Sequence, residues 1–135
     1  MTMLTTSRPG PGLRAALRVD AWSTGVFGIG LLTAAPLLRD PLGLPTAVSM
    51  LFGLGMLGGA AVLSRIAACP TVPAPLATGV AAVNAVSGLA MTGLAAADVL
   101  PLTAFGRAFL YSGALVVIVF AAVEHNARHD SAAVR

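Results

Sequence analysis

Long stretches without charged residues limit the fold of this chain more than any other feature. Four such stretches run over 21–38, 41–64, 66–97 and 108–123. A helix needs about 20 apolar residues to cross a bilayer core of about 30 Å. The composition agrees, because 57% of the 135 residues are hydrophobic and only 10% are charged. A soluble chain this short could not bury so much apolar surface, so the sequence indicates an integral membrane protein.

Prolines set the ends of the expected helices. The third stretch is too long for one span, and Pro70, Pro73 and Pro75 lie near its start. A proline inside a helix lacks the N–H donor and clashes with the preceding turn, so these residues belong to a loop. We therefore expect membrane spans over about 20–38, 46–68, 76–97 and 102–123.

Short connections between the spans make neighbouring helices antiparallel. The predicted fold is therefore all-α, a four-transmembrane-helix up-down bundle over 17–125. A flexible cytoplasmic segment is expected over 1–16, and a solvated cytoplasmic tail over 126–135. The residues over 13–19 either extend the first helix or form amphipathic turns on lipid headgroups.

The distribution of arginine predicts the orientation. With the N-terminus in the cytoplasm, one side would hold Arg8, Arg14, Arg18, Arg65, Arg128 and Arg135, and the other only Arg39 and Arg107. Cytoplasmic loops carry an excess of basic residues, so both termini are expected there. The arginines are scattered without interleaved aromatic residues, which argues against nucleic acid as a partner.

Small residues mark the faces on which membrane helices can approach closely. Gly28, Gly55, Gly59 and Gly88 lie on such faces, and Gly55 and Gly59 form a GxxxG motif. These faces either pack the helices of one chain together or join the chain to a second copy or to another membrane protein. Both interpretations stay open from the sequence.

Polar residues inside the spans are functional candidates, because burying them in lipid is costly. Asn84 and Tyr111 are expected at similar depth from opposite surfaces. The simpler interpretation is a hydrogen bond between helices. The alternative is a mid-membrane cavity for a ligand, lined by Asn84, Thr92, Tyr111 and Ser112.

Four charged residues also fall in or beside the expected spans. Arg107 is expected to pair with Asp98 across a short turn, or else to serve an anion or proton pathway. Asp20 and Glu124 are expected at the inner boundary of the membrane, whereas a carboxylate that couples to proton movement would lie deeper.

No grouping of residues typical of an enzyme or a cofactor site is present. His125 and His129 share a helical face and could hold a metal, but a solvated helix end explains them better. The single cysteine, Cys69, excludes an intrachain disulfide and a cysteine zinc site. We therefore expect a protein without enzymatic activity, cofactor or metal.

The chain resembles a group of uncharacterised small four-helix integral membrane proteins of bacteria, especially actinobacteria. The resemblance covers about 17 to 125 and is carried by 17–21, 35–38, 42–45, Asn84, 102–107 and 119–124. It implies the four-helix fold and a bacterial inner membrane, and it implies no activity. A fainter likeness is to SPW-repeat membrane proteins, whose Ser-Pro-Trp signature this chain lacks.

Two functions are expected from these patterns. The first is a structural or accessory role, exercised through helix–helix association with itself or with a membrane partner. The second is a small transporter or a lipophilic-ligand binder that uses a cavity around Asn84 and Tyr111.

Overall fold

The computed structural model describes residues 11–133, and this part of the chain is all-α, as the sequence predicts. Its five helices are α1 (Pro11–Thr33), α2 (Ala35–Leu42), α3 (Thr46–Ala68), α4 (Ala74–Ala96) and α5 (Ala104–Ala133). Three of them, α3, α4 and α5, are long and apolar enough to cross a membrane. A fourth crossing is present if the bent pair α1 and α2 counts as one span. Arg8 and Arg135 lie outside the described residues.

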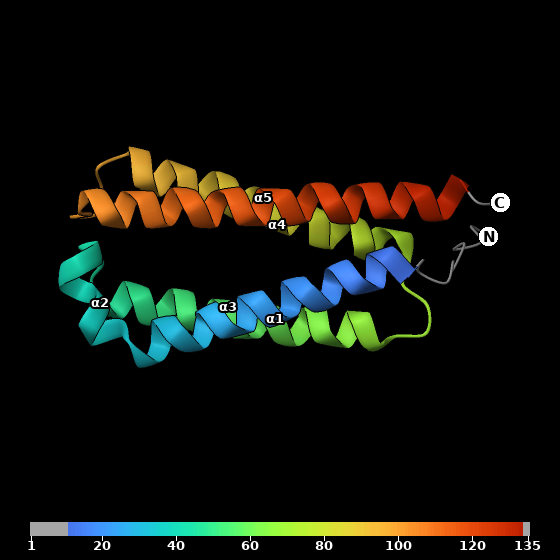
Figure 1. Cartoon of the computed structure of the whole chain (residues 1–135), viewed down its shortest axis with the longest axis horizontal. Helices are drawn as coiled ribbons and strands as arrows, with labels where there is room; N and C mark the ends of the chain where they lie inside the picture. Colours follow the sequence, from blue (N-terminus) through green and yellow to red (C-terminus); the bar gives the residue numbers. More distant parts are fainter. Residues whose placement is uncertain (1–10, 134–135) are drawn as a thin grey trace.

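The helices form two pairs. α1 packs along α3, and α4 packs along α5. The two pairs meet mainly through α1 and α5, and the short α2 contacts α1, α3 and α5. Figure 1 shows the four long helices side by side, with the start of α1 and the end of α5 at the same end of the molecule and α2 at the other end.

The spans predicted in the middle of the chain agree well with the structure. α3 has the predicted bounds 46–68, and α4 begins two residues before the predicted 76. The outer helices are longer than expected. α1 takes in 11–16, assigned above to a flexible segment, and α5 takes in 126–133, assigned to a tail. The remaining residues of both segments, 1–10 and 134–135, lie outside the described part.

Packing explains the longer helices. At the end where α1 starts, Leu13 and Leu17 are buried in an apolar cluster with residues of α3 and α4, and Ala127 of α5 packs against the same cluster. Arg14 also fixes this end, because its Nη2 donates to the carbonyl of Cys69 at 2.8 Å. The ends of both outer helices are thus held by tertiary contacts.

The first expected span, 20–38, is broken. α1 and α2 meet at an angle of 89°, and the break falls at Ala34. The cause is Pro36, which cannot donate to the carbonyl of Leu32 and would clash with it if the helix continued. In the first turn of a new helix the missing N–H costs nothing, so α2 begins here.

α2 joins the two helix pairs at the end away from the termini. It stops at Gly43, whose φ of 67° lies in the left-handed region that glycine adopts readily. Thr103 then connects the end of α2 to α5. Its N–H donates to the carbonyl of Leu42 at 3.1 Å, and its hydroxyl donates to that of Pro41 at 2.6 Å. The same hydroxyl accepts from the N–H of Gly106 at 2.9 Å, which caps the start of α5.

Candidate functional site

A cluster of polar side chains joins three helices in the interior. Asp20 comes from α1, Asn84 from α4 and Glu124 from α5. The amide Nδ2 of Asn84 donates to Oδ2 of Asp20 at 2.7 Å and to Oε2 of Glu124 at 3.1 Å. One amide group therefore bridges two carboxyl groups that are far apart in the sequence. We call these three residues the carboxyl cluster.

Both carboxyl groups are removed from solvent, since Asp20 and Glu124 are each 1% exposed. Their surroundings differ. The second oxygen of Asp20 accepts a hydrogen bond from the hydroxyl of Thr24, one turn further along α1, at 3.0 Å. The second oxygen of Glu124, Oε1, is buried and has no hydrogen-bond partner among the described residues. The cluster therefore keeps one unoccupied acceptor position.

The carboxyl cluster lies in the interior of its three helices and not at their ends. The sequence places Asp20 and Glu124 at the inner boundary. In the structure both reach Asn84, which lies about 15 Å along α4 from Ala74, near the middle of that helix. The reason is the extra length of α1 and α5, which moves residues 20 and 124 from helix ends into helix interiors.

The structure does not bring Asn84 and Tyr111 together, so these two residues do not line the ligand cavity that the sequence suggests. Asn84 bonds Glu124, and Tyr111 lies about 20 Å from Glu124 along α5. Tyr111 and Ser112 are exposed on α5, and the hydroxyl of Thr92 donates to the carbonyl of Gly88 within α4, at 2.9 Å. These three residues therefore lie apart from the carboxyl cluster.

The ion pair expected between Arg107 and Asp98 is present. Arg107 also donates through Nη1 to the carbonyl of Ala95 at 3.3 Å, so it ties the start of α5 to the end of α4. Asp98 adopts a φ of 53°, a left-handed conformation that aspartate tolerates better than most residues. The side chains are 37% and 72% exposed, so the pair lies at the surface of the chain and not in its interior.

The glycines expected to pack helices fall into two classes. Gly28 and Gly88 pack inside the chain. A Cβ at Gly28 would lie 3.0 Å from the carbonyl oxygen of Gly53 in α3, and one at Gly88 would lie 2.6 Å from Cγ1 of Ile118 in α5. Gly55 and Gly59 are different, because a Cβ at either would meet nothing within 4 Å. A Cβ at either glycine of the GxxxG motif would therefore lie in open space, and we call this part of α3 the open GxxxG face.

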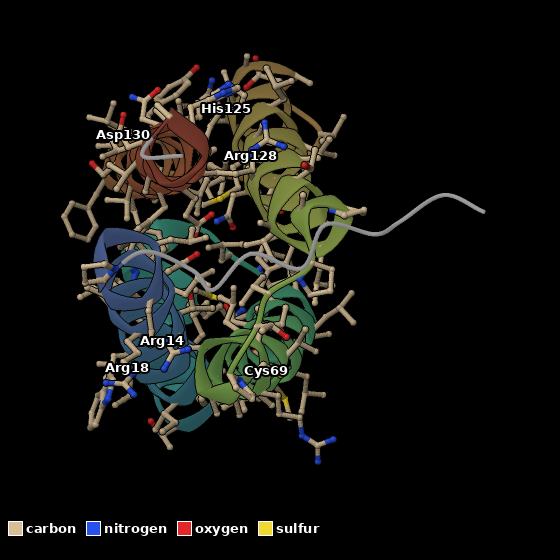
Figure 2. The ribbon with its side chains drawn as sticks, turned by 90° about the vertical axis from the view of Figure 1, so that its right-hand side faces the viewer. Arg14, Arg18, Cys69, His125, Arg128 and Asp130 are labelled. Atoms are coloured by element: carbon tan, nitrogen blue, oxygen red, sulfur yellow. The ribbon has the colours of Figure 1, made fainter. Side chains whose placement is uncertain are left out.

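The two histidines lie near the end of α5, beside Arg128. His125 and His129 place their Nε2 atoms 3.2 Å apart, and Arg128 contacts both rings and the hydroxyl of Thr78. Figure 2 views this end, with Arg14 and Arg18 on α1 and His125 and Arg128 on α5. Within residues 11–133, no group of three or more His, Cys, Asp or Glu side chains is placed to hold a metal.

Two shallow grooves follow the surface between α1 and α3. Their volumes are about 360 Å³ and 210 Å³, and both are lined by Ala21, Trp22 and Ser64. Trp22 is 76% exposed at this surface. The grooves lie on the outside of the helix pair and do not include Asn84, Asp20 or Glu124.

Comparison with protein-family models, with curated proteins and with solved structures finds no match to this chain.

Proposed function

We propose that this chain is a small non-enzymatic membrane protein whose four long helices form an up-down transmembrane bundle in a bacterial inner membrane, with both termini cytoplasmic. The arrangement of charge supports this orientation. Arg14, Arg18 and Arg128 lie at the end where α1 starts, and Arg65 lies in the last turn of α3, which ends at the same end of the molecule. Cytoplasmic ends of membrane helices carry such an excess of basic residues.

We propose further that the protein acts by associating, through α3, with a second copy of itself. The observation that carries this proposal is the open GxxxG face. Gly55 and Gly59 lie four residues apart on α3, and Gly58 beside them is equally free of neighbours. Glycines at this spacing let two membrane helices bring their backbones into close contact, which the chain does not use internally.

Replacing Gly55 and Gly59 by isoleucine tests this role. The change places bulky side chains at two positions where an added Cβ meets nothing within 4 Å in the same chain. We expect the parent protein in lipid nanodiscs or native membranes to crosslink as a dimer, and the double variant to be monomeric.

A matched control is available on α4. Gly79 and Gly93 are also exposed glycines with no neighbour within 4 Å of a Cβ. Isoleucine at both positions should leave the dimer intact. A parent protein that is monomeric in membranes at high density, or a dimer that survives the α3 change, would refute association through this face.

A small transporter remains a second candidate, and a specific observation favours it. The carboxyl cluster places two ionisable residues in the interior of helices that are expected to lie in lipid. Ionisable residues in such positions commonly mark the pathway of an ion or a proton. In this second role Asn84 acts with Asp20 and Glu124, and Tyr111 is not part of the site.

A further inference from the structure

The carboxyl cluster holds two acidic side chains that would repel each other if both were ionised. The carboxyl groups of Asp20 and Glu124 both accept from the same nitrogen of Asn84, at 2.7 Å and 3.1 Å, so they lie close together. Two ionised carboxylates at this distance repel each other strongly, the more so in an interior from which water is excluded. A single amide dipole cannot offset two negative charges.

Among the described residues, no basic side chain forms an ion pair with Asp20 or Glu124. The only ion pair among residues 11–133 is the one between Arg107 and Asp98, at the far end of the bundle. Toward the cluster α1 contributes Asp20 and the neutral Thr24, α4 contributes the neutral Asn84, and α5 contributes Glu124. The basic residues nearest in sequence have other partners or face outward. Arg14 bonds Cys69, Arg128 bonds Thr78, and Arg18 is exposed.

We propose that the Asp20–Asn84–Glu124 cluster is a proton-binding site, in which one proton is shared by the two carboxyl groups. Two carboxyl oxygens within hydrogen-bonding reach attract each other only when a proton lies between them. The hydrogen bonds indicate where the proton resides. Both oxygens of Asp20 accept hydrogen bonds from other side chains, whereas Oε1 of Glu124 has no donor. The unpartnered Oε1 of Glu124 is therefore the position that carries the proton.

The position of the carboxyl cluster between the two helix pairs allows its protonation to affect how the pairs pack together. Asp20 belongs to the α1–α3 pair, whereas Asn84 and Glu124 belong to the α4–α5 pair. The cluster is thus a polar bridge between two helix pairs that otherwise meet mainly through α1 and α5. Loss of the proton adds a second negative charge to this bridge. Release and uptake of the proton would therefore loosen and tighten the joint between the pairs.

This inference deepens the second candidate function, and its test measures proton binding and not transport. Infrared spectra of the full chain in nanodiscs, recorded from neutral to alkaline pH, report protonated carboxyl groups through their C=O band. At neutral pH we expect a band whose intensity corresponds to about one protonated carboxyl group per chain, because the two carboxyl groups of the cluster share one proton. We expect the band to disappear as the pH rises.

Two conservative variants assign the band. Glu124→Gln and Asp20→Asn keep the shape of each side chain while removing one carboxyl group. Glu124→Gln removes the group that carries the proton, so it should abolish the band. Asp20→Asn removes only the neighbouring charge, so the band should remain and disappear at a lower pH. Asp40→Asn is the control, because Asp40 is an exposed acid of α2 at the other end of the molecule. It should leave the band unchanged.

The parent protein alone can overturn the proposal, whether or not the variants fold. A parent spectrum without a protonated carboxyl group at neutral pH means that both acids are ionised, and the site does not hold a proton. A band that persists in Glu124→Gln also contradicts the assignment. Repeating the titration with sodium replaced by choline detects the rival ligand, since a sodium-dependent loss of the band at constant pH would make the site one for a metal cation. A transport assay that fails while the band behaves as expected would reject the transporter role and leave the proton site standing.

Discussion

Gly106, in the first turn of α5, lies directly against the backbone carbonyl of Leu42 at the end of α2, with no space for a side chain between them. This contact allows Thr103 to bond the carbonyls of Pro41 and Leu42. The junction holds the two helix pairs together at the end away from the termini. Neither helix could come this close with a larger residue at position 106.

Gly106→Ala is expected to destabilise the protein. The added Cβ would overlap the carbonyl of Leu42, and a backbone atom cannot move aside as a side chain can. Overpacking of this kind costs about 1–3 kcal/mol. Thermal unfolding in detergent measures the loss, and Gly79→Ala, which places its Cβ in open space, should show none. Equal stability of the two variants would contradict the close contact.

Two glycines of α3 separated by one residue are predicted to respond differently to alanine. A Cβ at Gly53 would lie 2.8 Å from the carbonyl oxygen of Gly28, so Gly53→Ala should force α1 and α3 apart. A Cβ at Gly55 meets nothing within 4 Å, so Gly55→Ala should leave the unfolding temperature of the monomer unchanged or slightly raised. The comparison is made in dilute detergent, where association does not contribute. Similar losses in both variants would mean that the helix faces are assigned wrongly.

The Arg107–Asp98 pair is predicted to contribute little through its charge. Both side chains are partly exposed, and exposed ion pairs contribute about 0–1 kcal/mol. Arg107→Leu should cost more than Asp98→Leu, because Arg107 also donates to the carbonyl of Ala95. A double-mutant cycle followed by thermal unfolding separates the pair energy from the rest. A coupling energy of several kcal/mol would show that the pair is buried by lipid or by a partner.

Trp22 offers a direct test of which surface faces lipid. It is the only tryptophan, and it is 76% exposed on α1. If α1 lies in the membrane as proposed, brominated acyl chains in nanodiscs should quench its fluorescence, and the aqueous quencher acrylamide should have a weaker effect. Unbrominated lipids serve as the reference. Quenching by acrylamide alone would place this face of α1 in water.

Reporter fusions test the proposed orientation. A reporter at the C-terminus and one inserted beside Asp40 in α2 should report opposite sides of the membrane, because α1 crosses before α2 begins. The C-terminal fusion should be active only in the cytoplasm, as the basic residues at that end require. A C-terminus outside the cytoplasm, or both sites on the same side, would disprove the proposed topology.

The sequence by itself determined the features that depend on neighbouring residues. Charge-free stretches of about 20 residues located the apolar helices, and the prolines that flank 46–68 set its bounds as α3 has them. Pro70 and Pro73 correctly marked the loop before α4, whereas Pro75, also expected in the loop, lies in the first turn of that helix, where a proline is tolerated. The short link between Asp98 and Arg107 was enough to predict their pairing. Each of these properties is local, so it can be recognised without knowing how the helices pack.

Only the tertiary structure decided which faces meet. Asp20 and Asn84 are 64 residues apart in the chain, and hydropathy does not define how a helix is rotated about its axis. The break at Ala34 turns α2 across the end of the bundle, and contacts at Leu13 and Ala127 lengthen the outer helices. These contacts between distant segments set the rotation and offset of the helices. As a result, Asp20 and Glu124 lie against Asn84 inside the chain, whereas Gly55 and Gly59 face outward.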